Sequence, residues 1–325
     1  MSRPLLEVKK LCTYYISYRG ERVVKAVDDL SFCINEGETV GLIGESGCGK
    51  STASISILRV LPPAAKIVSG EIVFKGENLL KKSDEEMCDQ VRGKKIAMIL
   101  QDPMSSLDPV FTIKQQIAEP LRLHKNLKGL PLLERIKELL NWVRISDPNG
   151  RLNQYPHQFS GGMRQRVVGA ISLTGMPDLL IADEPTTNLD VTIQAQYLQL
   201  LKDIQNKSGL GILFITHNLG IVAKLCSSVV VMYAGKAVEK AATIDLFNRP
   251  VHPYSQALLK AIPKIGAKEK IVPIAGQPPD LAELPRGCSF HPRCHLKIEK
   301  CLHEEPPETR LNESASVRCW LTEGK

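Results

Sequence analysis

One nine-residue stretch constrains the fold of this chain more than any other: Gly44-Glu45-Ser46-Gly47-Cys48-Gly49-Lys50-Ser51-Thr52. It matches the Walker A pattern G-x-x-x-x-G-K-[ST] at every fixed position. The apolar run 39–43 before it predicts a short buried strand, and residues 52–58 after it predict a helix. A glycine loop between a strand and a helix start directs backbone N–H groups and the helix dipole at an anion, so this stretch predicts a phosphate site.

Residues in and near this loop have distinct expected roles. Lys50 is predicted to reach the β- and γ-phosphates of a nucleotide, and the Ser51 hydroxyl to ligate Mg²⁺. Tyr15, upstream of the loop, is a candidate to stack on an adenine ring, with a packing role as the alternative. The candidate nucleotide-binding residues of the loop are Gly44, Glu45, Ser46, Gly47, Cys48, Gly49, Lys50, Ser51 and Thr52.

Composition indicates a globular protein of about two domains. The chain has 325 residues, of which 43% are hydrophobic and 24% charged. Its net charge of +7 is spread out, and no basic run is interleaved with aromatic residues, so we expect no nucleic-acid partner. The N-terminus has no secretory signal, and no apolar run approaches the roughly 18 residues that cross a bilayer. We therefore expect a cytosolic chain and assign any membrane crossing to other subunits.

The sequence pattern changes twice along the chain. Residues 5–38 alternate between apolar and polar, which predicts an antiparallel layer ahead of the P-loop. Helical periodicity from 111 to 145 predicts a helical insert at about 104–170, with Leu133, Ile136, Leu139, Leu140 and Val143 on one face. Ten of the 21 prolines follow residue 241. We predict an α/β domain over residues 1–240 and a small Pro- and Cys-rich domain over residues 241–325.

Two acidic residues follow the apolar run 179–182, in the Walker B pattern. This arrangement predicts a buried strand that delivers carboxylates at its C-terminal end, where α/β sheets place their ligands. We expect Asp183 to hold Mg²⁺, directly or through water, and Glu184 to polarise a water molecule that attacks the γ-phosphate.

Two further polar residues follow predicted strands. Gln101 comes after the strand 95–100 and is a candidate to touch Mg²⁺ and the attacking water, with a loop hydrogen bond as the alternative. His217 comes after the strand 211–216 and is a candidate to hydrogen-bond the γ-phosphate. Near the end of the insert, Ser160 is a good helix N-cap, and Gly161 and Gly162 expose helix-start N–H groups to a second anion.

Five landmarks follow one another within roughly residues 5–240: Walker A, Gln101, Ser160-Gly161-Gly162, Walker B with Glu184, and His217. This set resembles the nucleotide-binding subunit of an ABC transporter. The resemblance implies a P-loop ATPase core with a RecA-like parallel sheet, an antiparallel β layer and a helical insert, which binds ATP and Mg²⁺. It implies that Ser160, Gly161 and Gly162 complete the ATP site of a second nucleotide-binding subunit, identical or paralogous. It also implies two transmembrane permease subunits and a peripheral position on the cytoplasmic face of the membrane.

Two stretches narrow the resemblance. Met163 follows the Ser-Gly-Gly turn, and residues 248–254 read Asn-Arg-Pro-Val-His-Pro-Tyr. Both are similar to the oligopeptide, dipeptide and nickel importer branch, in which an extracytoplasmic binding protein supplies the substrate. The sequence does not select a particular peptide or nickel.

The last 38 residues contain four of the nine cysteines, Cys288, Cys294, Cys301 and Cys319, with the spacing C-x5-C-x6-C-x17-C. Four thiolates suit Zn²⁺ or a [4Fe–4S] cluster, and the wide spacing leans away from zinc. The layout resembles dipeptide-type importer ATPases in which such cysteines carry a [4Fe–4S] cluster, and we expect that cluster here, with zinc or no metal as alternatives.

Three other functions compete with a peptide importer ATPase. A soluble ABC ATPase of DNA repair or translation usually has paired cassettes or long coiled coils, whereas this chain has one cassette and a short insert. A P-loop GTPase would use a guanine motif, which Asn206-Lys207-Ser208-Gly209 resembles without the closing Asp. A redox or metal sensor would depend on the cysteines.

Overall fold

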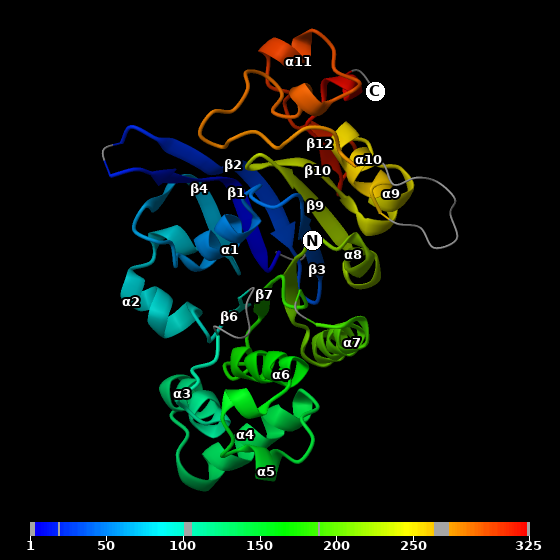
Figure 1. The fold of residues 1–325 in the computed structure, drawn as a ribbon. Coiled ribbons are helices and arrows are strands. Elements are labelled where there is room, and N and C mark those ends of the chain that lie inside the picture. Colours follow the sequence, from blue (N-terminus) through cyan, green and yellow to red (C-terminus); the bar gives the residue numbers. More distant parts are fainter. Residues whose placement is uncertain (1–3, 19, 101–105, 188, 263–272, 324–325) are drawn as a thin grey trace.

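The computed structural model describes residues 4–18, 20–100, 106–187, 189–262 and 273–323. Two β-sheets lie at the centre of these residues, and the helices of the predicted insert lie together at the lower end of Figure 1. Within the described ranges, the larger sheet has the order β11-β12-β10-β9-β3-β8-β7-β6, and the smaller has the order β2-β1-β4-β5. The predicted fold class, a P-loop α/β core with an antiparallel layer and a helical insert, is confirmed.

The larger sheet gathers the loops that carry the sequence motifs. Its first six strands in chain order are β3 (Thr39–Ile43), β6 (Ile96–Ile99), β7 (Leu179–Asp183), β8 (Gly211–Ile215), β9 (Ser228–Tyr233) and β10 (Lys236–Ala242). Strands β6, β7, β8, β3 and β9 are parallel neighbours, and every residue of β3, β7 and β8 is buried. Ile215 pairs with both Leu42 and Asp183, so the P-loop, Walker B and His217 leave the sheet at one edge.

The smaller sheet is antiparallel and covers the P-loop helix. It consists of β1 (Leu6–Ile16), β2 (Val23–Ile34), β4 (Ala65–Phe74) and β5 (Glu77–Asn78). Alternate residues toward the end of β2 are buried, namely Leu30, Phe32 and Ile34, which agrees with the alternation expected over residues 5–38. They share a core with Ala53 and Ile57 of α1 (Lys50–Leu58), which fixes the helix that begins at Lys50.

The helical insert presents one apolar stripe to its own core. Its helices are α3 (Ile113–Lys125), α4 (Gly129–Trp142), α5 (Pro148–Arg151) and α6 (Gly161–Ser172), preceded by α2 (Asp84–Glu86). Ile136, Leu139 and Leu140 of α4 are fully buried as expected. Leu132 rather than Leu133 completes the stripe, because position 132 lies four residues before Ile136 and faces the same way.

The remaining helices are α7 (Val191–Ser208), α8 (Leu219–Leu225), α9 (Thr243–Asn248), α10 (Pro253–Lys260) and α11 (Lys300–His303). Short single turns occupy η1 (Leu79–Lys81), η2 (Met87–Val91), η3 (Pro156–Gln158), η4 (His291–Arg293) and η5 (Trp320–Thr322). The stretch that resembled a guanine motif forms the last turn of α7 and its Gly209 C-cap, which is not a nucleotide-binding loop.

The C-terminal region adds two strands to the larger sheet. Strand β12 (Ser316–Val317) pairs antiparallel with β10, and β11 (Thr309–Arg310) pairs with β12. The boundary expected between residues 240 and 241 therefore lies within β10, and the sheet runs across it.

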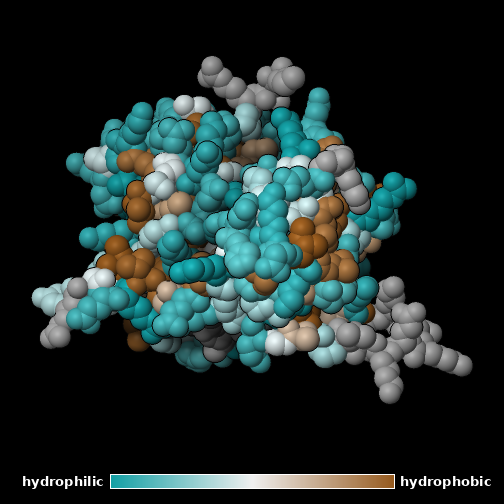
Figure 2. Space-filling model, turned by 90° about the horizontal axis from the view of Figure 1, so that it is seen from above, coloured by the Kyte–Doolittle hydropathy of each residue, from teal (hydrophilic) through white to brown (hydrophobic). Residues whose placement is uncertain are grey.

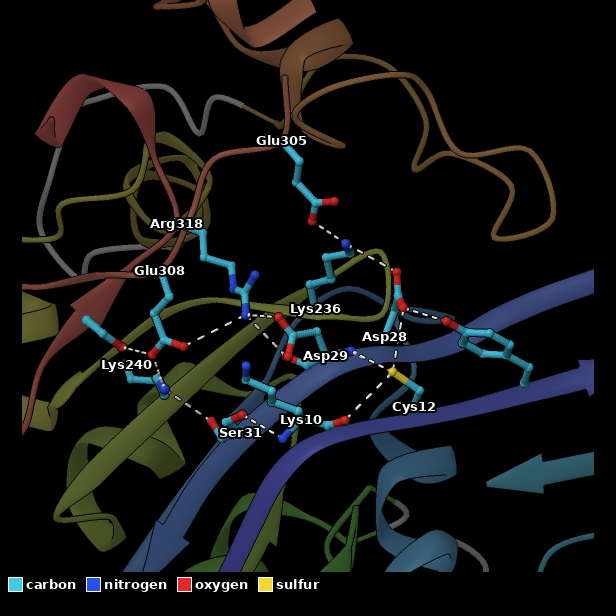
Figure 3. Close-up of polar contacts among 12 residues, drawn as sticks. Lys10, Cys12, Asp28, Asp29, Ser31, Lys236, Lys240, Glu305, Glu308 and Arg318 are labelled. Carbon is cyan, nitrogen blue, oxygen red and sulfur yellow. Dashed lines mark hydrogen bonds and ion pairs between the residues drawn. The ribbon is translucent and has the colours of Figure 1, made fainter. Parts of the chain in front are cut away.

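Charged side chains join this C-terminal region to the antiparallel layer (Figure 3). Arg318 donates to the Asp29 carboxylate at 2.6 Å, and its side chain is only 11% exposed. Lys236 of β10 pairs with both Asp28 and Glu305, and Lys240 pairs with Glu308. Because these pairs are partly buried and connected, they fix the region's orientation more firmly than isolated surface pairs would.

Candidate functional site

The P-loop begins at the end of β3 and leads directly into α1. Gly49 is the N-cap of that helix and has a φ of 104°. A Cβ atom at this position would lie 1.9 Å from the carbonyl oxygen of Ala26, so only glycine fits. The motif requires a glycine at position 49 because the loop approaches strand β2 closely there.

Lys50 points back into the loop that precedes it. Its Nζ atom donates to the carbonyl oxygens of Gly44 at 2.8 Å and Glu45 at 2.9 Å, and the residue is 7% exposed. The ammonium group is therefore fixed where phosphate oxygens would meet the backbone N–H groups of the loop.

A cavity lies against the loop. Its lining includes Tyr15 and Ala26 from the antiparallel layer and Glu184, which follows β7, together with residues 46–47 and 49–52 of the loop. The Tyr15 hydroxyl lies 3.5 Å from Thr52 Oγ1, so the tyrosine chosen from the sequence stands beside the predicted phosphate site. Leu281 also lines this cavity, and nothing in the sequence pointed to it, because it comes from a proline-rich segment far along the chain.

Asp183 ends β7 with a carboxylate suited to Mg²⁺. The residue is 4% exposed, and its Oδ1 atom has no hydrogen-bond partner within the described residues. Burial raises the pKa of Asp183, while the Ser51 hydroxyl and the charge of Lys50 oppose that rise. A buried, unsatisfied carboxylate oxygen beside the Ser51 hydroxyl is the donor set that Mg²⁺ prefers, so these residues fit the ion.

Several contacts hold Glu184 at the start of the next loop. Its backbone N–H donates to Ile215, its Oε2 accepts from the Thr187 hydroxyl at 2.9 Å, and its Oε1 lies 3.0 Å from His217 Nδ1. The residue has a φ of 46°, a conformation that costs about 1–3 kcal/mol and tends to persist at functional sites. Burial works to raise the pKa of Glu184, but the hydrogen bonds from His217 and Thr187 outweigh it and keep the carboxylate ionised. Thr187 was missed from the sequence, although its place three residues after Glu184 was a usable signal.

The Ser-Gly-Gly turn lies apart from this cavity. Ser160 is the N-cap of α6 and accepts a hydrogen bond from Met163, as predicted. Neither Ser160 nor the two glycines line the P-loop cavity, and a Cβ atom on Gly161 would meet no atom within 4 Å. The helix start is thus open to another molecule. Gln101, the other predicted ligand, lies outside the described residues.

Residues 27–187 match the family model described as ABC transporter. Residues 238–301 match the model described as the C-terminal region of oligopeptide/dipeptide transporters. A probable peptide ABC transporter ATP-binding protein of Sinorhizobium fredii is 48% identical over 97% of this chain and 94% of its own length. The dipeptide transport ATP-binding protein of Bacillus subtilis is 46% identical over 98% of this chain and 94% of its own.

The chain belongs to the ABC transporter ATP-binding proteins. Among solved structures, a dimeric ATP-binding cassette in a post-hydrolysis state, bound to ADP and Pi, has a TM-score of 0.65 and 26% identity. That match covers 73% of this chain and 98% of the cassette, so the ABC core accounts for most of the fold. Like its family, this ABC ATPase hydrolyses ATP.

The four C-terminal cysteines of the ABC ATPase line one small cavity, together with His291 and Trp320. Their thiols are free, and burial raises the pKa of Cys288 to about 11, with the neighbouring thiols adding to that rise. No group of three or more His, Cys, Asp or Glu residues in the described ranges is arranged to hold a metal ion. The cysteines therefore converge, but they do not form a preformed ligand set.

The described part of the ABC ATPase contains no helix with the length and apolar character needed to span a bilayer. Figure 2 shows the molecule from above, where hydrophilic residues cover most of the surface and hydrophobic residues gather in small separate patches.

Proposed function

We propose that this ABC ATPase powers the import of dipeptides or oligopeptides. The observation that carries the proposal is the union, in one chain, of an ABC cassette and the C-terminal region of oligopeptide/dipeptide transporters. Relatives that match almost the whole length carry peptide-import names, among them an oligopeptide transport ATP-binding protein of Bacillus subtilis that is 46% identical. Residues 1–240 would supply the ATPase and residues 241–325 the importer-specific part.

The nucleotide would lie in the cavity at the P-loop. Lys50 and the loop N–H groups hold the β- and γ-phosphates, and Tyr15 stacks on the adenine. Ser51, Asp183 and Gln101 hold Mg²⁺, which neutralises charge on the phosphates when bound. The unsatisfied Oδ1 of Asp183 supports this assignment.

Glu184 would accept a proton from the attacking water. Burial works to raise its pKa, but the hydrogen bonds from His217 and Thr187 lower it, so the carboxylate is ionised and can accept a proton. His217 holds the γ-phosphate through its second ring nitrogen, because Nδ1 is already directed at Glu184.

A second nucleotide-binding subunit, identical or paralogous, would complete the site. Its Ser160, Gly161 and Gly162 would contact the nucleotide bound by this chain, and the reverse would hold at the other site. The exposed start of α6 supports this arrangement. The pair lies on the cytoplasmic face of the membrane, where ATP binding closes it and hydrolysis reopens it, and this motion drives two transmembrane permease subunits. An extracytoplasmic peptide-binding protein supplies the substrate.

We also propose that Cys288, Cys294, Cys301 and Cys319 take up a [4Fe–4S] cluster, with zinc as the alternative. Their shared cavity supports a common ligand. Elemental analysis and a visible absorption spectrum of anaerobically purified protein would separate iron and sulfide from zinc, and Cys301→Ser should reduce whichever is present.

The transport function is tested with proteoliposomes that contain the assembled transporter and its binding protein. We expect ATP-dependent uptake of a labelled dipeptide or short oligopeptide, and no uptake when this subunit carries Glu184→Gln. Uptake of nickel instead of peptide would place the chain with nickel importers. Absence of uptake of either, with ATP hydrolysis intact, would refute the proposal.

A further inference from the structure

Two residues of the C-terminal region hold one residue of the P-loop. Arg293 reaches Glu45 with both terminal nitrogens: Nη1 lies 2.6 Å from Oε2, and Nη2 lies 3.0 Å from Oε1. The hydroxyl of Tyr254 accepts a hydrogen bond of 2.9 Å from the backbone N–H of Glu45. The P-loop is thus clamped by residues more than 200 positions away in sequence.

The third polar group of Glu45 connects this clamp to the phosphate-binding lysine. The Glu45 carbonyl accepts from Lys50 Nζ at 2.9 Å and from the Cys48 backbone N–H at 3.3 Å. A shift of Glu45 would therefore move the carbonyl that fixes the Lys50 ammonium. Walker A specifies no residue type at position 45, so the motif itself provides no reason for this carboxylate.

Arg293 is built into the protein and not a surface side chain. It is 4% exposed at the side chain, its Nε donates to the Ala275 carbonyl at 2.8 Å, and its guanidinium lies 5.8 Å from the Tyr233 ring centroid. The hydrogen bond with Glu45 raises the pKa of Arg293, so the group stays charged. A bidentate, desolvated pair of this kind is costly to break because the remaining charge loses its partner.

Tyr254 is equally fixed. It is fully buried, and its ring lies 4.6 Å from the Tyr233 ring and 5.3 Å from the Phe290 ring, measured between centroids. His252 accepts a hydrogen bond from the Tyr254 backbone N–H at 3.0 Å. The Asn-Arg-Pro-Val-His-Pro-Tyr stretch thereby places one hydroxyl at the P-loop.

We propose that Arg293 and Tyr254 are positioning residues for ATP binding, and that the C-terminal region sets the nucleotide affinity of the cassette through Glu45. Neither residue lines the nucleotide cavity. Both act by holding the loop turn whose carbonyls direct Lys50 toward the phosphates.

The test compares Arg293→Gln, Tyr254→Phe and Glu45→Gln in the full chain by ATP affinity and by steady-state hydrolysis. We expect Arg293→Gln to raise KM for ATP about tenfold, the loss typical of one charge-assisted hydrogen bond, with a smaller change in kcat. The double variant Glu45→Gln with Arg293→Gln should be no worse than Arg293→Gln alone, because no unpaired charge remains.

Arg318→Gln is the matched control. Arg318 ties the same region to Asp29 with a comparable buried pair but does not touch the P-loop. It should lower the melting temperature and leave KM for ATP unchanged. If Arg318→Gln raises KM as much as Arg293→Gln, general loosening explains the effect and the proposal fails. If Arg293→Gln does not fold, Tyr254→Phe decides: an unchanged KM in that variant refutes the clamp, and a raised KM supports it.

Discussion

His217 Nδ1 lies 3.0 Å from Glu184 Oε1, although the two residues are 33 positions apart. They follow β8 and β7, which are parallel neighbours in the sheet. The contact aims the carboxylate and leaves the second ring nitrogen of His217 available, since the side chain is 62% exposed. The proposed catalytic base and the proposed phosphate contact thus follow two adjacent strands of the sheet.

Glu184→Gln should preserve ATP binding and reduce turnover by at least about 100-fold, because a neutral amide cannot accept the proton of the attacking water. Equilibrium binding of ATP and single-turnover hydrolysis measure the two effects separately. Thr187→Val serves as the control, since it removes one hydrogen bond from Glu184 and keeps the base. Turnover above a tenth of wild type in Glu184→Gln would assign the base to another residue.

Two inactive variants should restore activity when they are mixed. Lys50→Ala damages the P-loop half of a site, and Gly161→Arg blocks the Ser-Gly-Gly half, at a position where an added Cβ atom meets no other atom within 4 Å. Each proposed site combines the P-loop of one subunit with the Ser-Gly-Gly turn of the other. In a dimer of one variant with the other, one site therefore contains both substitutions and the second site contains neither. If this chain pairs with itself, random pairing should recover up to about a quarter of wild-type ATPase activity. Full inactivity of the mixture, with dimers detected by sizing, would contradict a shared site.

Alanine substitutions at two P-loop glycines should differ sharply in stability. Gly47 has a φ of 80°, but a methyl group added there would meet no atom within 4 Å, so Gly47→Ala should cost only the left-handed strain of about 1–2 kcal/mol. Gly49→Ala adds a clash at 1.9 Å with the Ala26 carbonyl and should cost several-fold more. Urea unfolding monitored by circular dichroism measures both, and equal losses would argue against the close approach at Gly49.

The free energy of unfolding should decrease as the pH decreases, in part because of His252. This residue is 1% exposed, and burial lowers its pKa to about 3 from an ordinary 6.5. Between these values the unfolded chain binds one more proton than the folded chain. The contribution of neutral His252 to the free energy of unfolding is therefore fully present above pH 6.5. Below that pH it decreases by up to about 1.4 kcal/mol for each pH unit. His252→Asn retains an acceptor for the Tyr254 N–H but fits the buried site less well, and its melting temperature should therefore be lower at pH 7.5. Because asparagine does not titrate, the melting temperature should decline less between pH 7.5 and 5 than that of the wild type. If the melting temperature declines equally with decreasing pH in both proteins, His252 does not cause the pH dependence.

The residues around the P-loop cavity could be predicted from the sequence for a physical reason. Parallel strands that are buried on both faces appear as short apolar runs, and their C-terminal ends meet at one sheet edge. The residues after the runs 39–43, 179–182 and 211–216 had to converge, and the positions of Lys50, Asp183 and His217 agree with that rule.

Other contacts had no sequence signal. The bidentate pair of Glu45 with Arg293 joins two loop residues that no periodicity relates. Strands β11 and β12 have two residues each, too short for any alternation to show. The convergence of the cysteines was suggested by their number and layout, through a resemblance, because no periodicity of helix or strand relates positions 288, 294, 301 and 319.

The clamp on Glu45 has a consequence for how the protein is made. A ribosome completes both Walker motifs and His217 well before it reaches Arg293. During that interval the nascent chain already contains every motif for ATP but lacks the guanidinium that secures the loop. If the clamp acts as proposed, full nucleotide affinity is gained only late in translation, and a truncated product that ends before residue 293 would bind ATP weakly.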